Sequence, residues 1–195
     1  MRILFLLAAI WLFPSAFAEE APGTKSIFLV AKKGMPDPFF GDAVVLVTNA
    51  AVAPIGVIIN KRLDVPLAKA LPHAETLKDR DDRLYFGGPV QSRDVVYIFR
   101  SKEPVENAMR LFDGVYMTGS REILDGLLAR DNPLEGLRIY AGHAGWSPGQ
   151  LEGEIARGDW DLLPADEASI FTSKPENLWV EMRRRVSATK VRYTH

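Results

Sequence analysis

Residues 43–60 read AVVLVTNAAVAPIGVIIN, two apolar and β-branched runs joined by a turn of small residues that ends at Pro54. Short apolar runs of this kind, bounded by turn residues, are typical of buried strands. We therefore predict strands over residues 43–48 and 55–60. A similar run at Ile27–Ala31 predicts the strand that precedes them.

On both sides of this pair, strand-like and helix-like segments follow one another in mixed order. A doubly wound sheet would require a strict alternation of strands and helices. The order favours one α/β domain of the mixed α+β type. Further strands are predicted over residues 84–86, 95–100, 115–117, 137–140, 160–163 and 169–171, and helices after Pro66, after Ser120, from Ser147 to Gly158 and from Ser173 onward.

Two of the predicted helices begin with a capping-box pattern, in which a serine caps the helix and a Gln or Glu three positions later reaches back to it. The first pair is Ser147 and Gln150, and the second is Ser173 and Glu176. Arg183–Arg185 is expected in the last turn of the final helix, where cations complement the helix dipole.

The N-terminus has the three parts of an export signal: Arg2, an apolar run over residues 3–13, and the triplet Ala16-Phe17-Ala18. Signal peptidase cuts after small-x-small triplets of this type. A membrane anchor is the alternative, but the run is shorter than the roughly 20 residues that span a bilayer. We predict a periplasmic protein with no membrane span after cleavage. Its segments are a signal peptide (1–18), a leader (19–25), one domain (26–186) and a basic C-terminal tail (187–195).

The composition limits the classes of partner and of chemistry. The 195 residues include 24 Lys and Arg, 25 Asp and Glu, and no Cys. Without an excess of positive charge, the chain has no field that would draw nucleic acid or anionic lipid to it. The lack of Cys excludes disulfides, thiolate catalysis and Cys-ligated zinc. His73, His143 and His195 are scattered without metal-ligand spacing, so we predict neither a metal nor a cofactor.

Four stretches carry a family resemblance through their order and spacing. They lie within residues 28–40, 56–61, 87–90 and 144–152, and they include FLVA with MPDPFF, GVIINK, GGPV, and AGWSPGQLE. Through them the chain resembles the YqgE/AlgH family over nearly all of its predicted mature length. The resemblance implies a single domain with a complex, branched and partly barrel-like β-sheet surrounded by helices.

One branch of this family is described as a transcriptional regulator of exopolysaccharide (alginate) synthesis. Family members usually lack a signal peptide and are presumed cytosolic, whereas this chain begins with one. A periplasmic protein cannot reach the chromosome, so export counts against a transcriptional role here. Two local differences are His143, where the family more often has Tyr, and Ser147, where it often has Gly.

The segment around Gly142–Gln150 is the first candidate for a site. Residues 141–146 predict a turn that leads into the helix at Ser147, where free backbone N–H groups can hold a carboxylate or phosphate. A close-packed strand-to-helix corner explains the same glycines, and their spacing matches neither the dinucleotide fingerprint nor the P-loop. The candidate ligand-binding residues are Gly142, His143, Gly145, Trp146, Ser147, Gly149 and Gln150.

A second candidate is an anion site formed by Asn60, Lys61, Gly87 and Gly88. Exposed backbone N–H donors beside a cation can bind an anion if the two segments meet in space. The alternative is a tight hairpin corner with a solvated lysine, as is usual for basic residues in loops.

The absence of catalytic motifs favours a non-catalytic binding or regulatory domain, which contacts an unidentified small molecule or protein near Gly142–Gln150. The alternative is a periplasmic hydrolase in which Ser147 and His143 act with Asp159 or Asp166. No Gly-x-Ser-x-Gly elbow is present, and capping a helix is a sufficient role for Ser147. Nucleic-acid regulation is a third hypothesis that would require a cytosolic protein.

Overall fold

The computed structural model describes residues 26–49 and 53–192, so the predicted signal peptide and leader lie outside the described residues. The described chain forms ten strands, five α-helices and two short 3-10 helices. The strands are β1 (Ile27–Ala31), β2 (Val44–Asn49), β3 (Pro54–Ile58), β4 (Arg62–Pro66), β5 (Arg83–Phe86), β6 (Val90–Arg100), β7 (Met109–Phe112), β8 (Val115–Thr118), β9 (Leu137–Gly145) and β10 (Trp160–Pro164). The helices are α1 (Leu67–Ala70), η1 (Glu75–Leu77), α2 (Arg121–Leu128), α3 (Gln150–Arg157), α4 (Glu167–Ile170), η2 (Pro175–Asn177) and α5 (Leu178–Arg192).

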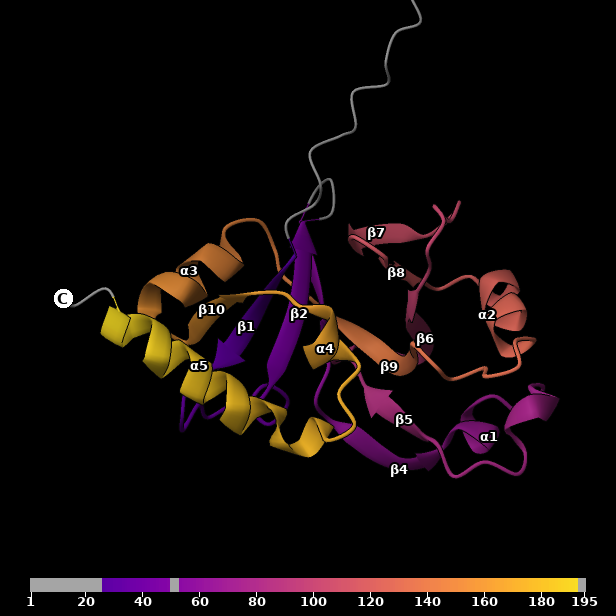
Figure 1. Cartoon of the computed structure of the whole chain (residues 1–195). Coiled ribbons are helices and arrows are strands. Elements are labelled where there is room, and N and C mark those ends of the chain that lie inside the picture. The colour runs from indigo at the N-terminus through magenta and orange to yellow at the C-terminus, as the bar shows by residue number, and fades with distance from the viewer. Residues whose placement is uncertain (1–25, 50–52, 193–195) are drawn as a thin grey trace, which may run out of the picture.

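The strands form a strongly curled half-barrel with the order β10-β1-β2-β3-β9-β6-β8-β7 (Figure 1). Neighbouring strands along this path are antiparallel. The sheet branches at β9, which pairs with β3, with β6 and, in parallel, with β5 of the β4–β5 hairpin. These features confirm the predicted single α/β domain with a branched, partly barrel-like sheet and surrounding helices.

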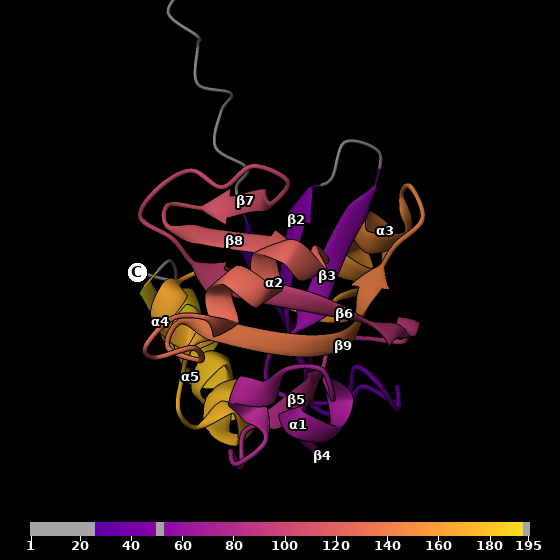
Figure 2. The ribbon, with the colours of Figure 1, turned by 90° about the vertical axis from the view of Figure 1, so that its right-hand side faces the viewer.

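Helices cover the sheet because each presents an apolar face to it. Helix α5 lies across β1, β2 and β10 (Figure 1). Its Leu178, Met182 and Val186 recur every four residues and are buried. Helix α2 lies over another part of the sheet, beside β6 and β9 (Figure 2), and buries three leucines in a separate apolar cluster with Tyr97 and Ile139.

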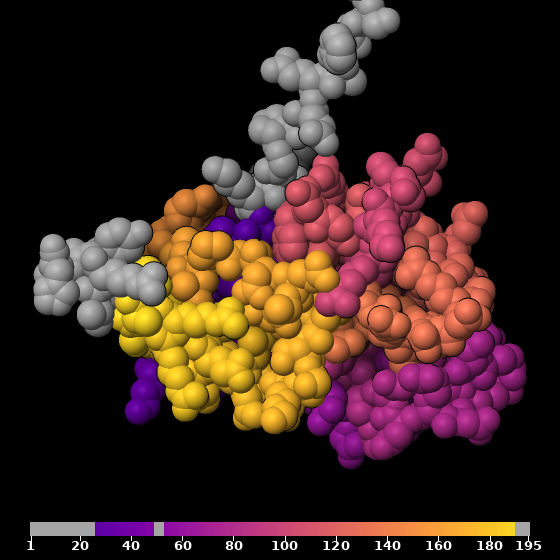
Figure 3. Space-filling model, in the orientation of Figure 1, coloured from indigo at the N-terminus to yellow at the C-terminus, as the bar shows by residue number. Residues whose placement is uncertain are grey.

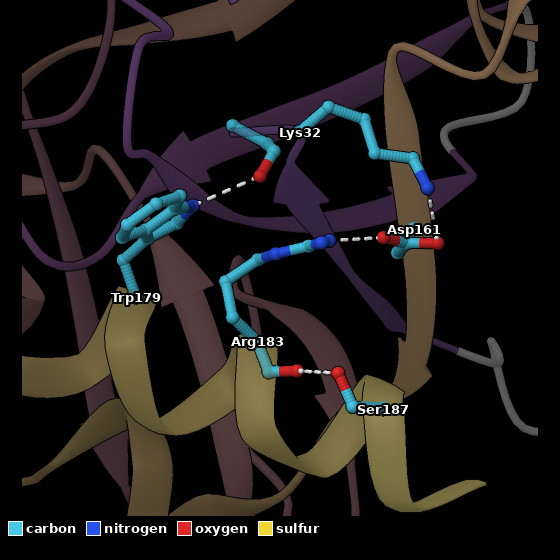
Figure 4. Close-up of polar contacts among 6 residues, drawn as sticks. Lys32, Asp161, Trp179, Arg183 and Ser187 are labelled. Carbon is cyan, nitrogen blue, oxygen red and sulfur yellow. Dashed lines mark hydrogen bonds and ion pairs between the residues drawn. The ribbon is translucent and has the colours of Figure 1, made fainter. Parts of the chain in front are cut away.

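A buried carboxylate fastens α5 to the sheet (Figure 4). The Asp161 side chain on β10 is 9% exposed and forms ion pairs with Lys32, at 2.8 Å, and with Arg183 of α5. Beside it, Trp179 Nε1 donates a 2.9 Å hydrogen bond to the carbonyl of Ala31, at the end of β1. The two ends of this contact join α5 to β1 and β10, the first and last strands of the chain.

Several predicted elements are confirmed within a residue or two. The three N-terminal runs form β1, β2 and β3, and the segment after Pro66 forms α1. Ser120 caps α2, because its Oγ accepts a hydrogen bond from Ile123 N at 3.4 Å. Gly158 ends α3 with a φ of 81°, the left-handed conformation that glycine adopts at helix ends.

The prediction of a strand over residues 169–171 is wrong. Ser169 and Ile170 belong to the short helix α4, and the reason is a cap that the sequence reading missed. The Asp166 carboxylate accepts hydrogen bonds from the Ser169 N–H and hydroxyl, at 2.8 and 2.7 Å. A capped turn satisfies these donors locally, so the segment does not need a strand partner.

The predicted start and end of the final helix are also wrong. Ser173 does not cap α5, because the 3-10 turn η2 comes first and its preceding residue, Lys174, makes no side-chain cap. Helix α5 continues to Arg192, so Arg183–Arg185 lies in its middle and the predicted tail begins inside the helix. Arg183 and Arg185 form ion pairs with Asp161 and Asp166 instead of complementing the helix end.

Two strands and half of a third were not predicted. β4 reads RLDVP and β7 reads MRLF, and both carry charged, exposed side chains that break an apolar run. β6 begins at Val90 rather than at Val95, because the polar residues between them stay attached to the sheet as a bulge.

Candidate functional site

The segment 141–146 is not the turn that the sequence predicts, since β9 runs through it to Gly145. Its backbone is paired on both sides, His143 with Val90 of β6 and Gly145 with Ile55 of β3. Gly142 and Gly145 therefore lie inside a sheet rather than in a loop.

Gly142, Gly87 and Gly88 allow two backbones to pack directly on each other. A Cβ on Gly142, whose φ is +67°, would lie 2.4 Å from the carbonyl oxygen of Gly88. A Cβ on Gly87 would lie 2.2 Å from the oxygen of Gly142, and one on Gly88 would lie 2.3 Å from the carbonyl of His143. Side chains cannot fit at these distances, so close packing accounts for the glycines at this junction.

Three donors of the predicted anion site, on Asn60, Lys61 and Gly87, have protein partners. Asn60 is buried, its Oδ1 accepts from Val44 N at 2.8 Å, and its Nδ2 donates to a carbonyl at 3.0 Å. The Gly87 N–H donates to the Ala141 carbonyl at 2.8 Å. Lys61 Nζ donates to a loop carbonyl, and desolvation lowers the pKa of Lys61 although two nearby aspartates oppose the shift. The geometry adds no support to an anion site here.

In the second half of the first candidate site, residues 146–150, the side chains of Trp146 and Gln150 hydrogen-bond to one carboxylate, that of Glu154. Trp146 Nε1 and Trp160 Nε1 each donate to Glu154 Oε2 at 2.9 Å, and Gln150 Nε2 donates to Glu154 Oε1 at 2.9 Å. Half of the predicted capping box forms, because Gln150 Oε1 accepts from Ser147 N at 3.1 Å. The cap itself is Gly149, with a φ of 78°, so the prediction of Ser147 as N-cap is wrong.

The hydrolase alternative finds its acids engaged elsewhere. Asp159 pairs with Arg157, whereas Asp166 caps α4 and pairs with Arg185. No hydrogen bond joins Ser147 Oγ to the His143 ring within the part of the chain that the structure describes. Without an acid beyond His143, the pair does not form the nucleophile, base and orienting group that a triad needs.

His143, in contrast, faces a cavity. Val90 pairs with His143 and Val95 with Ala141, so residues 91–94 of β6 stand opposite the single residue Gly142. This β-bulge, residues 91–94, forms one wall of a cavity of about 600 Å³, which we call the bulge pocket. It lies between α2 and the segment that follows α1. Its lining residues are Ala70–Ala74, Gln91, Arg93–Tyr97, Gly119, Arg121, Leu124, Asp125 and His143.

The bulge holds a residue in an unfavourable backbone conformation. Gln91 has a φ of 46°, in the left-handed region. The other non-glycine residues with positive φ among those the structure describes are Asp42 and Asn107, residue types that tolerate this region. Strained residues and bulges are both enriched at functional sites, where they aim side chains that a regular strand would not.

Charges of both signs meet in the bulge pocket. Arg93 and Arg121 provide two cations, and Asp94 and Asp125 provide two anions. The imidazole rings of His73 and His143 line the same pocket. The wall includes the Tyr97 hydroxyl, whose pKa is raised mainly by burial and further by Asp125, against a smaller opposing effect of Arg121. The pocket therefore offers donors, acceptors and apolar surface to one ligand.

A family model described as AlgH-like matches residues 28–190. A UPF0301 protein of Methylococcus capsulatus is 34% identical over 172 residues, which cover 86% of this chain and 94% of that protein. The chain belongs to the AlgH-like family. Its predicted resemblance to the YqgE/AlgH family is thus confirmed.

Two solved structures share the AlgH-like fold. The solution structure of the AlgH protein from Pseudomonas aeruginosa has a TM-score of 0.70 and 28% identity, with 86% of this chain and 92% of that chain covered. The crystal structure of a Corynebacterium diphtheriae protein, DIP2367, has a TM-score of 0.66 and 29% identity, with coverages of 86% and 89%.

Most residues of the bulge pocket were not among those predicted from the sequence to bind a ligand. Of the predicted ligand residues, His143 lines it, whereas Ser147 and Gln150 contribute to the corner at Glu154. One signal was available: four polar residues, 91–94, interrupt an apolar strand between two valines. Among the described residues, no cluster of three or more His, Asp or Glu side chains is arranged to hold a metal, and no helix is long and apolar enough to cross a membrane.

Proposed function

We propose that this AlgH-like chain is a ligand-binding regulatory domain without chemistry of its own, and that its ligand is a small organic molecule held in the bulge pocket. One observation carries the proposal. Residues 91–94 leave the ladder opposite Gly142, with Gln91 strained at a φ of 46°, and the cavity that they wall contains His143. A strained bulge persists only where the surrounding structure over-determines it, which is typical of a functional site.

The lining of the pocket favours a zwitterionic ligand with an apolar part. Arg93 and Arg121 suit a carboxylate, and Asp94 and Asp125 suit an ammonium group. Apolar side chains such as Leu71 and Leu124 complete the wall. A purely anionic ligand would lie beside two carboxylates, and a purely cationic one beside two guanidinium groups, so a molecule bearing both charges fits better. Arg121 and Asp125 form an exposed ion pair at 3.8 Å, and exposed pairs of this kind are weak enough to exchange for the charges of a ligand.

The experiment is a thermal-unfolding screen of the mature chain with free amino acids and dipeptides. A ligand that binds only the folded state raises the unfolding midpoint in proportion to the logarithm of its concentration over its Kd. We expect a shift in the wild type that His143→Ala abolishes. Ser147→Ala is the matched control, because Ser147 belongs to the same predicted segment but lies outside the pocket, and it should keep the shift. A panel without any shift, or a shift that survives His143→Ala, contradicts the proposal.

We further propose that the protein acts in the periplasm. The support is the sequence of residues 1–18, with its charged end, apolar run and Ala16-Phe17-Ala18 triplet. The test is a fusion of residues 1–30 to alkaline phosphatase, an enzyme that is active only after export. We expect periplasmic phosphatase activity. An inactive fusion would contradict export and would favour a cytosolic protein, for which nucleic-acid regulation is again a hypothesis.

A further inference from the structure

Three arginines share one face of the three strands β4, β5 and β9. Arg62 stands opposite Tyr85 in the β4–β5 ladder, and Tyr85 stands opposite Tyr140 in the β5–β9 ladder. Paired residues project to the same side of a sheet, and so do residues two positions apart in one strand. Arg83, two before Tyr85, and Arg138, two before Tyr140, therefore lie on the same face as Arg62.

These arginines line a cavity of about 210 Å³, which we call the arginine pocket. It shares no residue with the bulge pocket. Thr172 and Ser173, in the segment between α4 and η2, close it on one side. Figure 3 shows the orange-yellow surface of that part of the chain next to the purple surface of the β4 region.

Arg138 is half-buried but faces only neutral partners. Its guanidinium lies 5.9 Å from the centroid of the Tyr85 ring and 5.8 Å from that of Phe171. The terminal nitrogens donate to the carbonyls of Leu137, Phe171 and Thr172, at 3.0 to 3.3 Å. The Nε–H is buried and has no hydrogen-bond partner among the described residues. A buried charge without a counter-ion is costly, and a bound anion would relieve that cost.

Two carboxylates, Asp81 and Asp82, also line the arginine pocket, and each is paired with a cation other than Arg62 and Arg138. Arg83 pairs with Asp81 and Asp64, whose side chains are 90% and 99% exposed, and Asp82 pairs with Arg80. Exposed pairs of this kind are weak and exchange readily with a competing anion. Arg62 has no ion-pair partner among the residues that the structure describes. Arg62 and Arg138 thus supply two positive charges that no carboxylate neutralises.

We propose that the arginine pocket binds a small phosphate-type oxyanion. Guanidinium groups offer forked N–H donors that match tetrahedral oxyanions, and the hydroxyls of Thr172 and Ser173 can add neutral hydrogen bonds. The volume suits a free phosphate ion or the phosphate of a monoester rather than a large organic ligand. This site is independent of the bulge pocket, so either proposal can fail without the other.

The test is a titration of the mature chain with inorganic phosphate at constant ionic strength, followed through the arginine Nε–Hε resonances. We expect saturable binding that shifts the Arg138 resonance. Arg62→Gln should weaken it by roughly tenfold, the worth of one charge-assisted hydrogen bond. Arg62 is exposed and contacts no carboxylate, so its removal leaves the fold intact, whereas Arg138→Met tests the same point with a risk to stability.

Arg184→Gln is the matched control, because Arg184 is an exposed cation of α5 that lines neither pocket, and its loss removes the same charge. Its phosphate affinity should equal that of the wild type. Equal weakening by Arg62→Gln and Arg184→Gln, or shifts that never saturate, would show only general attraction to the surface and would overturn the proposal. Once saturable binding is seen, competition by glycerol phosphate assigns the site to monoesters, and a lack of competition assigns it to free phosphate.

Discussion

The two halves of the Gly142–Gln150 segment differ in where their polar groups point. In the second half, the indole of Trp146 and the amide of Gln150 donate to Glu154, so the corner is closed on itself. In the first half, His143 faces a cavity whose wall is the bulge over residues 91–94. Neighbouring residues of one predicted site thus have opposite roles, and satisfied hydrogen bonds distinguish the structural half from the open one.

The glycine junction holds both halves in place. Gly88 and Gly142 let the backbones of β9 and of the segment before β6 touch. The bulge lies on one side of this contact, opposite Gly142, and the corner at Glu154 follows it in the chain. Polar residues at a tight turn are therefore poor indicators of a ligand site until their partners are known.

The largest expected effect comes from breaking this junction with Gly88→Ala. The new Cβ would lie 2.3 Å from the carbonyl carbon and oxygen of His143, and backbone atoms cannot move aside cheaply. We expect a loss of about 3 kcal/mol or more in the free energy of unfolding, measured by urea denaturation. Gly126→Ala in α2 is the control, because nothing lies within 4 Å of its Cβ, and it should gain about 0.5 to 1 kcal/mol. A loss of less than about 0.5 kcal/mol in the free energy of unfolding, as for an ordinary surface substitution, would mean that the junction is not tightly packed.

Glu154→Gln breaks the closed corner alone. The glutamine amide has one oxygen, so it cannot accept from both indoles and from Gln150 at once. We expect a loss of about 1 to 2 kcal/mol and a change in tryptophan fluorescence, with ligand binding in the bulge pocket retained. Glu152→Gln, on an exposed position of the same helix, should change stability by less than about 0.5 kcal/mol. Similar losses for the two variants would remove the distinction between a closed and an open half.

Gln91→Gly acts on the open half and has the smallest effect on stability, with the opposite sign. Glycine adopts a positive φ without strain, which outweighs its greater entropy loss on folding, so we expect a gain of about 0.5 kcal/mol. Ser92→Gly, at a neighbouring bulge position without positive φ, should instead lose about 0.5 to 1 kcal/mol. A loss in both variants, in thermal and urea unfolding, would show that the bulge stores no strain at Gln91.

Much of the fold could be predicted from the sequence, because buried strands and capped helices leave local patterns. β1, β2 and β3 are continuous apolar runs, and Ser120 is a local cap for α2. β4 and β7 were missed because exposed charged side chains hide them, although β4 pairs with β5 and β7 with β8, in each case the next strand of the chain. The apolar pattern of residues 169–171 predicted a strand, but these residues begin in α4 because the Asp166 side chain caps that helix.

The candidate site was harder to predict because its members come from four separate segments. His143 was included for its position beside the glycines, but only the fold brings it to His73, Arg121 and residues 91–94. Glu154 was missed although its donors are close in sequence, because only the fold brings Trp146, which follows β9, and Trp160 of β10 to the same carboxylate oxygen. Sequence patterns report local geometry, and this pocket depends on a long-range register between β6 and β9.

The most direct test of the central claim is to map, by backbone amide chemical shifts, the amino acid or dipeptide that most stabilises the protein. A ligand of the bulge pocket should perturb the amides of Gln91, Arg93–Tyr97, His143 and Arg121, since these residues line the cavity. Perturbations confined to Ser147–Gln150, in the corner closed by Glu154, would contradict the assignment of the site to the open half of the segment.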